Sequence, residues 1–355
     1  MYATKRLSEF KVTPEAALQP PPEGPSSAYL VVKEEDPDEE TNTCCWGFCC
    51  GPRIRELPFP QNKFLTVTYS RQEGENRRTY SETVLFVPVL NLPLSANRYY
   101  VVVAKGKRQG QVYTCSKEED MTTCCFCQCI QDVKPKPFDH RDIYHQIEII
   151  PHKGRFTAKS VAADGFPPWI LRQKYWTLHE NKPMNDQLGE AFGINKNTRL
   201  NYLELNTTTN VIAGKWYCPF IFLKEVSALK DQMKRSTFYE VTLEQFWEEV
   251  YSGTAKKRIL FEGKEIMKEE RESTEGFVWF RKTGDVTRER IGLSLALWER
   301  VKWEENREGW DEGASAMSEM KFGGFVLVER FSFKRLDGSV VLALDFIHSN
   351  KVRSQ

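Results

Sequence analysis

Apolar and polar residues alternate over much of this chain, and a period of two predicts β-strands rather than helices. Between Lys63 and Cys115 the apolar runs are rich in β-branched and aromatic residues, and they are separated by Pro93 and by a loop at residues 105–110. The loop sequence, K-G-K-R-Q-G, predicts a hairpin. Strands are therefore expected over residues 28–32, 64–69, 83–90, 98–104, 111–115 and 215–223.

The C-terminal third carries the clearest strand pattern. From Ile291 to Trp303 apolar side chains occupy every second position, and Glu299 is the exception. Further along, Asp337-Gly338 separates two apolar runs, and this dipeptide is typical of a type I′ hairpin turn. The prediction is a three-stranded antiparallel meander built from residues 291–303, 325–336 and 339–348.

Helices are predicted in a few places only. The strongest pattern covers residues 242–251, where Thr242 and Gln245 match a capping box and Val241 and Phe246 match a hydrophobic staple. Shorter helices are expected from Thr13 onwards, over residues 184–192 before Gly193, and over residues 225–234. The pattern as a whole predicts an α+β fold of predominantly antiparallel β-sheets, with a few short helices and a cysteine-rich N-terminal arm.

Proline and charge divide the chain into four parts. The run P-P-P-E-G-P at residues 20–25 fits neither a helix nor a central strand, and the acidic run at residues 33–40 is typical of a solvated segment. The run K-P-K-P at residues 134–137 indicates a boundary. We predict an extended arm over 1–60, an N-terminal β region over 61–135, a mixed α/β region over 136–235, and a C-terminal helix plus β meander over 236–355.

Composition excludes some classes of protein. The chain has 355 residues, with 50 Lys and Arg against 49 Asp and Glu, so its overall charge gives no footprint for nucleic acid and no global attraction to an anionic membrane. No apolar run approaches the roughly 20 residues of a membrane-spanning helix. Tyr2 stands where N-myristoylation needs Gly, and no secretory signal follows it. We expect an intracellular, cytoplasmic protein in a reducing compartment.

Eight of the ten cysteines gather in two short windows, and Cys115 and Cys218 are expected in the core. The first cysteine island, C-C-W-G-F-C-C, contains Cys44, Cys45, Cys49 and Cys50. The second cysteine island, C-C-F-C-Q-C, contains Cys124, Cys125, Cys127 and Cys129.

Several strings of the sequence are specific enough to carry a resemblance. They are L-P-F-P-Q-N at residues 57–62, T-C-S-K-E-E-D-M at 114–121, the second cysteine island, and D-I-Y at 142–144. Together they resemble a plant-restricted family known only as domain of unknown function 1262. The resemblance implies a plant protein, and it brings no established activity and no catalytic residue.

Four interpretations of the islands remain open. Zinc needs four thiolate or imidazole ligands in closely spaced pairs, which Cys45 with Cys49 and Cys124 with Cys127 would supply. S-palmitoylation uses apolar, exposed cysteine strings, and two islands would give the two anchors that stable membrane attachment needs. Neighbouring thiols can also close strained, readily reduced disulfides, as in redox sensors. Finally, cysteine can simply fill a core as a small apolar side chain.

No sequence motif points to a reaction. G-x-S-x-G, P-loop, dinucleotide-binding and H-E-x-x-H motifs are absent. His140 and His145 lie near two carboxylates, but their spacing favours a solvated boundary loop. We therefore expect a non-enzymatic interaction protein with an unknown protein partner, whose islands serve membrane attachment, assembly or sensing. The alternatives are a zinc-stabilised or thiol-redox-responsive protein, and an enzyme of unrecognised type.

Overall fold

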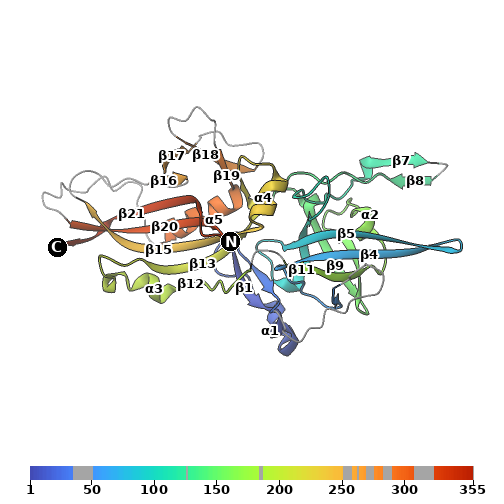
Figure 1. Ribbon diagram of the computed structural model, residues 1–355, viewed down its shortest axis with the longest axis horizontal. Helices are drawn as coiled ribbons and strands as arrows, with labels where there is room; N and C mark the ends of the chain where they lie inside the picture. The colour runs from blue at the N-terminus through green and yellow to red at the C-terminus, as the bar shows by residue number, and fades with distance from the viewer. Residues whose placement is uncertain are drawn as a thin grey trace.

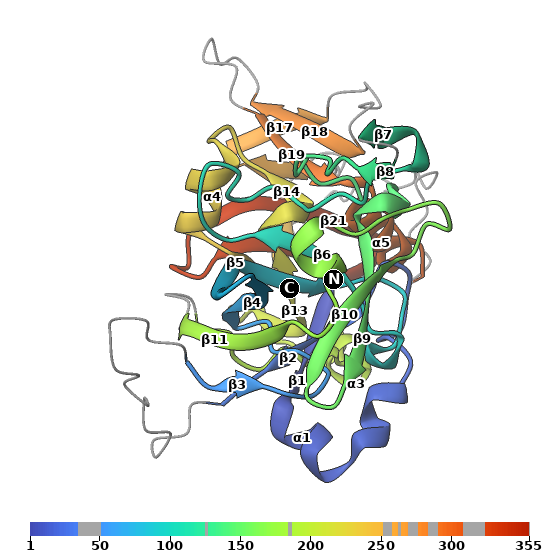
Figure 2. The same ribbon diagram turned by 90° about the vertical axis from the view of Figure 1, so that its right-hand side faces the viewer.

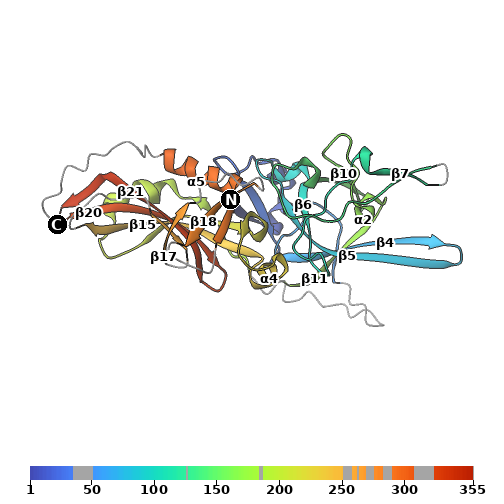
Figure 3. The ribbon, with the colours of Figure 1, turned by 90° about the horizontal axis from the view of Figure 1, so that it is seen from above.

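Two β-sheets, one toward each end of an elongated molecule, make up most of the computed structural model (Figures 1 and 3). The structure describes residues 1–34, 51–124, 127–183, 187–250, 258–261, 264–268, 276–282, 290–307 and 324–354. Within these residues only strands β1 (Tyr2–Arg6) and β2 (Ala28–Val32) pair in parallel. The predicted antiparallel β fold with few helices is therefore confirmed.

The larger sheet has 12 strands. Besides β1 and β2, they are β12 (Gly193–Ile194), β13 (Val211–Pro219), β14 (Leu223–Lys224), β15 (Phe238–Val250), β16 (Arg258–Phe261), β17 (Lys264–Lys268), β18 (Phe277–Lys282), β19 (Arg290–Ser294), β20 (Gly324–Arg335) and β21 (Val340–Ser354). Their order is β14-β19-β18-β17-β16-β21-β20-β15-β13-β1-β2, and β12 pairs with β13.

The helix predicted over residues 242–251 is wrong, because this segment belongs to strand β15. Antiparallel neighbours β13 and β20 pair along β15 from both sides. Val241, Leu243 and Trp247 are buried on one face of the strand, as a period of two requires. Gln245 also falls on that face and is fully buried, and this one polar residue interrupts the apolar alternation. The interruption made a strand resemble a capped helix.

The predicted meander is correct only for its last two strands. β20 and β21 form the expected hairpin, but its turn is not type I′, because Gly338 (φ +87°) is the one loop residue with positive φ. The predicted first strand of the meander, residues 291–303, divides instead into β19 and helix α5 (Leu295–Arg307). β19 lies between β14 and β18, away from β20. Leu297, Arg300 and Val301 are buried at helical spacing.

The smaller sheet has seven strands in the order β10-β9-β6-β5-β4-β11-β3. They are β3 (Arg53–Ile54), β4 (Lys63–Glu73), β5 (Asn76–Pro88), β6 (Arg98–Val103), β9 (Gln146–His152), β10 (Arg155–Ser160) and β11 (Thr177–Pro183). A bridge between Phe156 and Trp176 links β10 to the start of β11, so the two ends of the sheet approach each other. Its core is aromatic, with Phe59 packed against Phe86, Tyr99 and Phe156. The predicted strands over residues 64–69, 83–90 and 98–104 are confirmed to within two residues at their C-terminal ends, whereas residues 111–115 contain only isolated bridges at Val112 and are not a strand.

The two sheets share one hydrophobic core. Val87 and Tyr100 of the smaller sheet belong to the same buried cluster as Tyr2 and Phe222, which lie on the side of the larger sheet. The Tyr100 and Phe222 rings are 6.3 Å apart, and the Tyr2 hydroxyl donates to the Pro88 carbonyl at 2.8 Å. The join between the sheets is therefore packed as a protein interior.

Residues 1–32 do not form the extended arm predicted for residues 1–60. Met1, Tyr2 and Ala3 are buried, and β1 lies between β13 and β2 inside the larger sheet. The Met1 amine donates to the Ser26 carbonyl, and burial, followed by the charge of Arg300, lowers its pKa to about 4. The proline run is thus a connection between two sheet strands.

The remaining helices are short. They are α1 (Leu7–Val12), α2 (Trp169–Arg172), α3 (Lys196–Leu200), α4 (Leu229–Arg235) and 3₁₀ turns at Pro14–Leu18, Leu94–Ala96, Glu118–Asp120, Ile143–His145, Tyr202–Glu204 and Phe220–Phe222. The turn after Thr13 and helix α4 match predictions in part. Residues 187–192 are not helical, and Gly193 begins strand β12. No helix in the described part of the chain is long and apolar enough to cross a membrane.

Candidate functional site

The second cysteine island lies on a hairpin that stands apart from both large sheets. Strands β7 (Met121–Cys124) and β8 (Cys127–Ile130) pair antiparallel as a separate two-stranded sheet. In Figure 1 this hairpin extends from the end of the molecule that carries the seven-stranded sheet. The segment from Met121 to Ile130 contains no charged residue. A two-stranded hairpin is marginally stable in water by itself, so its placement depends on its base.

The base of the hairpin is fixed by Ser116, which belongs to the T-C-S-K-E-E-D-M string. The Ser116 hydroxyl donates to the Gln131 carbonyl at 3.0 Å and accepts from the Val133 amide at 3.1 Å. Its backbone exchanges two hydrogen bonds with Phe166. Beside it, Arg172 forms an ion pair with Asp132 at 3.2 Å. One buried serine therefore joins the two sides of the hairpin to the body.

The backbone register of the hairpin relates its cysteines to one another. Cys124 lies directly opposite Cys127, and Cys129 lies opposite Thr122. Cys129 is free and exposed. Cys125 is outside the described residues. Three of the four second-island positions are thus placed on one projecting element.

The two isolated cysteines lie in the core, as predicted. Cys115 is 1% exposed, and burial raises its pKa to about 11 in spite of a hydrogen bond with Ser160. Cys218 is fully buried, and burial raises its pKa to about 12. Both thiols are therefore protonated at neutral pH, and neither has the character of a nucleophile.

The first cysteine island lies outside the described residues, so Cys44, Cys45, Cys49 and Cys50 are not placed. The described residues on either side of it meet at Glu180. Lys33 forms an ion pair with the Glu180 carboxylate at 2.8 Å, and the Glu180 amide donates to the Pro52 carbonyl at 2.9 Å. Figure 2 views the molecule from the end that carries the seven-stranded sheet. In that view strand β3, just beyond Pro52, and the β7–β8 hairpin lie on different sides of the molecule.

The predicted zinc ligands Cys45, Cys49, Cys124 and Cys127 are therefore not brought together by anything the structure describes. Among the described residues, no group of three or more His, Cys, Asp and Glu side chains could hold a metal ion. Because Cys45 and Cys49 fall outside those residues, the zinc site stays a prediction.

The histidine-containing segment at residues 139–145 is not the solvated loop that we expected. His145 is 2% exposed, and its ring stacks on Phe138 with 6.3 Å between centroids. Its Nδ1 atom lies 3.2 Å from the Asp139 carbonyl oxygen, and burial lowers its pKa. His145 is therefore a neutral packing residue, and Asp139 is engaged by Arg141 at 2.9 Å.

A buried ionic network in the larger sheet was not predicted. Its members are at most 4% exposed and are Arg199, Gln245, Arg300, Glu304, Glu329 and His348. Arg199 donates to both oxygens of Glu329, at 2.9 and 2.7 Å, and to Glu304 at 2.6 Å. Burial alone would raise the pKa of Glu329, but hydrogen bonds from Arg199 and His348 outweigh it and lower the pKa to about 2. The network joins α3 and α5 to β20, and polar residues on apolar faces were its signal in the sequence.

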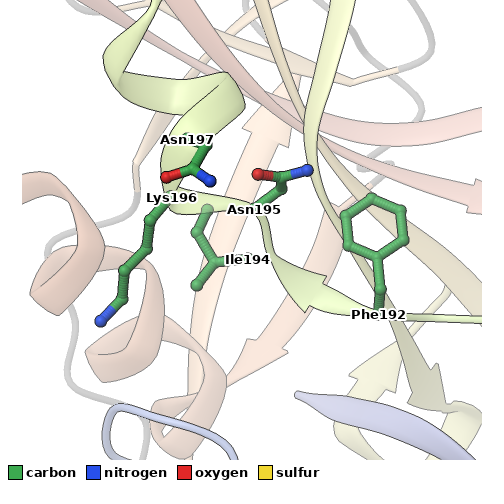
Figure 4. Close-up of a pocket in the computed structure, with 5 residues that line it drawn as sticks. All are labelled: Phe192, Ile194, Asn195, Lys196 and Asn197. Atoms are coloured by element: carbon green, nitrogen blue, oxygen red, sulfur yellow. The ribbon is translucent and has the colours of Figure 1, made fainter.

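A shallow pocket of about 300 Å³ lies where β12 leads into α3 (Figure 4). Phe192, Ile194, Asn195, Lys196 and Asn197 line it. The Asn195 side chain accepts from the Thr198 amide and caps α3, and Lys196 forms an ion pair with Glu23 at 2.7 Å. Asn195 and Lys196 therefore serve the fold, and among the described residues no acid–base pair lines the pocket.

Comparison with known proteins finds a match between part of the chain and a family whose function is unknown. Residues 23–126 match a family described as "Protein of unknown function (DUF1262)". The matched stretch contains the first cysteine island and ends inside the second. It confirms the resemblance to a domain of unknown function.

No curated protein matches the chain. Among solved structures, one described as "Crystal structure of Cry35Ab1" is 10% identical and covers 83% of this chain and 90% of its own, with a TM-score of 0.41. At that score the likeness is too low to carry an argument.

Proposed function

We propose that this is a non-enzymatic interaction protein of the cytoplasm that attaches to a membrane through S-acylation of its cysteine islands. The observation that carries the proposal is the β7–β8 hairpin, an uncharged, cysteine-rich element outside both large sheets on which Cys129 is exposed. Exposed apolar segments on soluble proteins usually mark a contact with a partner or a membrane.

The two islands match the physical requirement for stable attachment. One acyl chain holds a protein only marginally, since each buried methylene contributes about 0.8 kcal/mol. Acyl chains on both islands would add their free energies of membrane binding. The hydrogen bonds of Ser116 support this function, because they fix the base of the hairpin and leave its strands outside both large sheets. An acyl chain on the hairpin could therefore enter a bilayer without disturbing either core.

The hairpin register favours one second candidate, a thiol-redox response. Residues directly opposite in an antiparallel pair have Cα atoms about 4.5–5.5 Å apart. That separation falls within the range that a disulfide spans, about 4.4–6.8 Å. Cys124 and Cys127 are such a pair. The zinc-stabilised and enzymatic alternatives have no comparable support among the described residues.

Thioester chemistry tests the proposal. The protein would be expressed in eukaryotic cells that acylate cysteines, and its thioesters would be captured after cleavage with hydroxylamine. We expect capture of the wild-type protein, and loss of hairpin-derived capture in the variant Cys124→Ser/Cys125→Ser/Cys127→Ser/Cys129→Ser. The matched control Thr122→Ser/Thr123→Ser changes the same hairpin and keeps every thiol, so its capture should be unchanged.

Two results would contradict acylation. The first is wild-type protein without hydroxylamine-sensitive modification. The second is a native mass that is lower by two hydrogens than that of the reduced chain, because this identifies a disulfide and supports the redox candidate instead.

A further inference from the structure

A second surface feature lies at the same end of the molecule, where strand β3 meets the turn between β9 and β10. Five basic residues belong to these segments and to the chain just before Trp176, and we call them the basic patch. All five are exposed, and within the described residues none forms an ion pair with a carboxylate. They are Arg53, Arg55, Lys153, Arg155 and Lys174.

Contacts at Gly154 bring Arg53 and Arg55 to the turn that carries Lys153 and Arg155. The Arg53 guanidinium donates to the Gly154 carbonyl at 2.8 Å. A methyl group on Gly154 would lie 3.5 Å from the Cβ of Arg55, so the stem of Arg55 runs beside the same turn. Burial lowers the pKa of Arg53, and the charges of Arg55 and Arg155 lower it further. Like charges held this close repel one another, and an anion bound between them would relieve the repulsion.

An exposed aromatic pair borders the patch. Tyr175 is 46% exposed, and its ring lies 4.7 Å from that of His152, which is opposite Arg155 in the β9–β10 register. Tyr175 has a φ of +65°, which is uncommon for a bulky residue. The next residue, Trp176, is fixed by its bridge to Phe156, so the fold holds Tyr175 at the surface. Amphipathic aromatic rings of this kind are enriched where proteins meet the membrane–water interface.

We infer that the basic patch binds the anionic surface of a membrane, with lipid phosphate and carboxylate groups between its guanidinium and ammonium groups. The inference rests on the proposed attachment through the cysteine islands and names the lipid surface involved. In the sequence the first cysteine island ends three residues before Arg53, so the two proposed attachment features are neighbours along the chain. One acyl chain together with a polybasic patch is a combination that gives stable attachment.

The unmodified protein tests this inference. Recombinant protein without acyl groups would be sedimented with vesicles of phosphatidylcholine alone or of phosphatidylcholine with phosphatidylserine. We expect binding only to the anionic vesicles, and weaker binding as salt is raised. Each basic side chain near such a surface contributes about fivefold in binding constant. The variant Arg53→Gln/Arg55→Gln/Arg155→Gln should therefore bind about a hundredfold more weakly.

A matched control removes the same charge elsewhere. Arg71→Gln/Arg77→Gln/Lys107→Gln also neutralises three exposed cations, on the β4–β5 hairpin and the loop after β6. This control should keep most of the binding, and both variants should retain the wild-type melting temperature. Equal losses in the two variants would show a general effect of net charge and would overturn the inference.

Two further results would also overturn it. One is wild-type protein that does not bind anionic vesicles, and the other is wild-type protein that binds single-stranded nucleic acid instead of vesicles at the same salt. Because the protein used carries no acyl chain, missing thioesters in cells would contradict the proposed function and leave this inference standing.

Discussion

Replacing Arg199 by an uncharged residue should destabilise the protein more than replacing almost any other charged residue. Arg199 is 4% exposed, and it neutralises two buried carboxylates, those of Glu304 and Glu329. The substitution Arg199→Met keeps most of the apolar stem and removes the guanidinium. Glu329 would then be a buried carboxylate without its main partner. Breaking a buried ion pair in this way costs about 3–5 kcal/mol.

The pKa of Glu329 gives a second route to the same magnitude. Its pKa is lowered from 4.5 to about 2, and each unit corresponds to about 1.4 kcal/mol, so its partners favour the folded carboxylate by about 3 kcal/mol. Because the folded pKa lies below the unfolded one, this stability is fully present above pH 4.5 and is lost as the pH falls toward about 2. The two routes agree in size.

Urea unfolding followed by tryptophan fluorescence would measure the effect at neutral pH. The matched control is Arg78→Met, because the Arg78 pair with Glu73 is solvated, with Arg78 68% exposed, and such pairs contribute about 0–1 kcal/mol. The double variant Arg199→Met/Glu329→Gln should recover part of the loss, since it removes the unpaired charge. If Arg199→Met and Arg78→Met lose the same free energy of unfolding, the reasoning on the network is refuted.

Three other predictions can be checked directly. Gly338→Val should lower the free energy of unfolding by about 1 kcal/mol or more, because valine is strained at φ +87°, and an unchanged melting temperature would mean that the turn tolerates branching. Alkylation of the native protein should modify Cys129, whereas Cys115 and Cys218 should react only after unfolding, because burial raises their pKa to about 11 and 12; their rapid native reaction would contradict the described burial. Ser116→Ala should remove the acceptor of the partly buried Val133 amide and destabilise the hairpin base by about 0.5–1.5 kcal/mol, seen as faster hydrogen exchange across residues 121–130 with the two cores unaffected.

The sequence predicted most strands but not their partners. Runs such as residues 64–69 and 98–104 were recognisable because period two is a local property. The pairing of β1 with β13 joins segments more than 200 residues apart, and no local pattern contains it. The N-terminal segment was therefore interpreted as an arm, although Tyr2 is buried in the larger sheet.

The two largest errors have one physical cause. Gln245 on β15 and Arg300 on α5 are polar residues on buried faces, where both belong to the ionic network. Gln245 interrupts the apolar alternation of β15, so that strand resembled a helix. Arg300 instead falls on the polar side of the period-two pattern from Ile291 to Trp303, so α5 resembled a half-exposed strand although Arg300 is buried. Only their partners, Glu329 and Glu304, make these positions understandable, and those partners are identified in three dimensions.

The candidate site was partly predictable for a similar reason. The cysteine islands were evident from the sequence, because clustering of one residue type is visible without a fold. The basic patch was not, because Arg53, Lys153 and Lys174 come from three separate segments and the total charge of the chain is nearly balanced. Charge that is neutral on average can still be concentrated on one surface.

The core shared by the two sheets has a mechanical consequence. Swinging one sheet relative to the other would expose Tyr2, Val87, Tyr100 and Phe222, at a cost of about 1.5–3 kcal/mol for each side chain. The sum is comparable to the whole stability of a typical protein, about 5–15 kcal/mol. The molecule should therefore behave as a stiff rod rather than a hinged pair. A ligand bound at the end that bears the β7–β8 hairpin would be held at a constant distance and orientation from one bound at the opposite end, where β20 begins and β21 ends, so the length of the protein would set a fixed spacing between them.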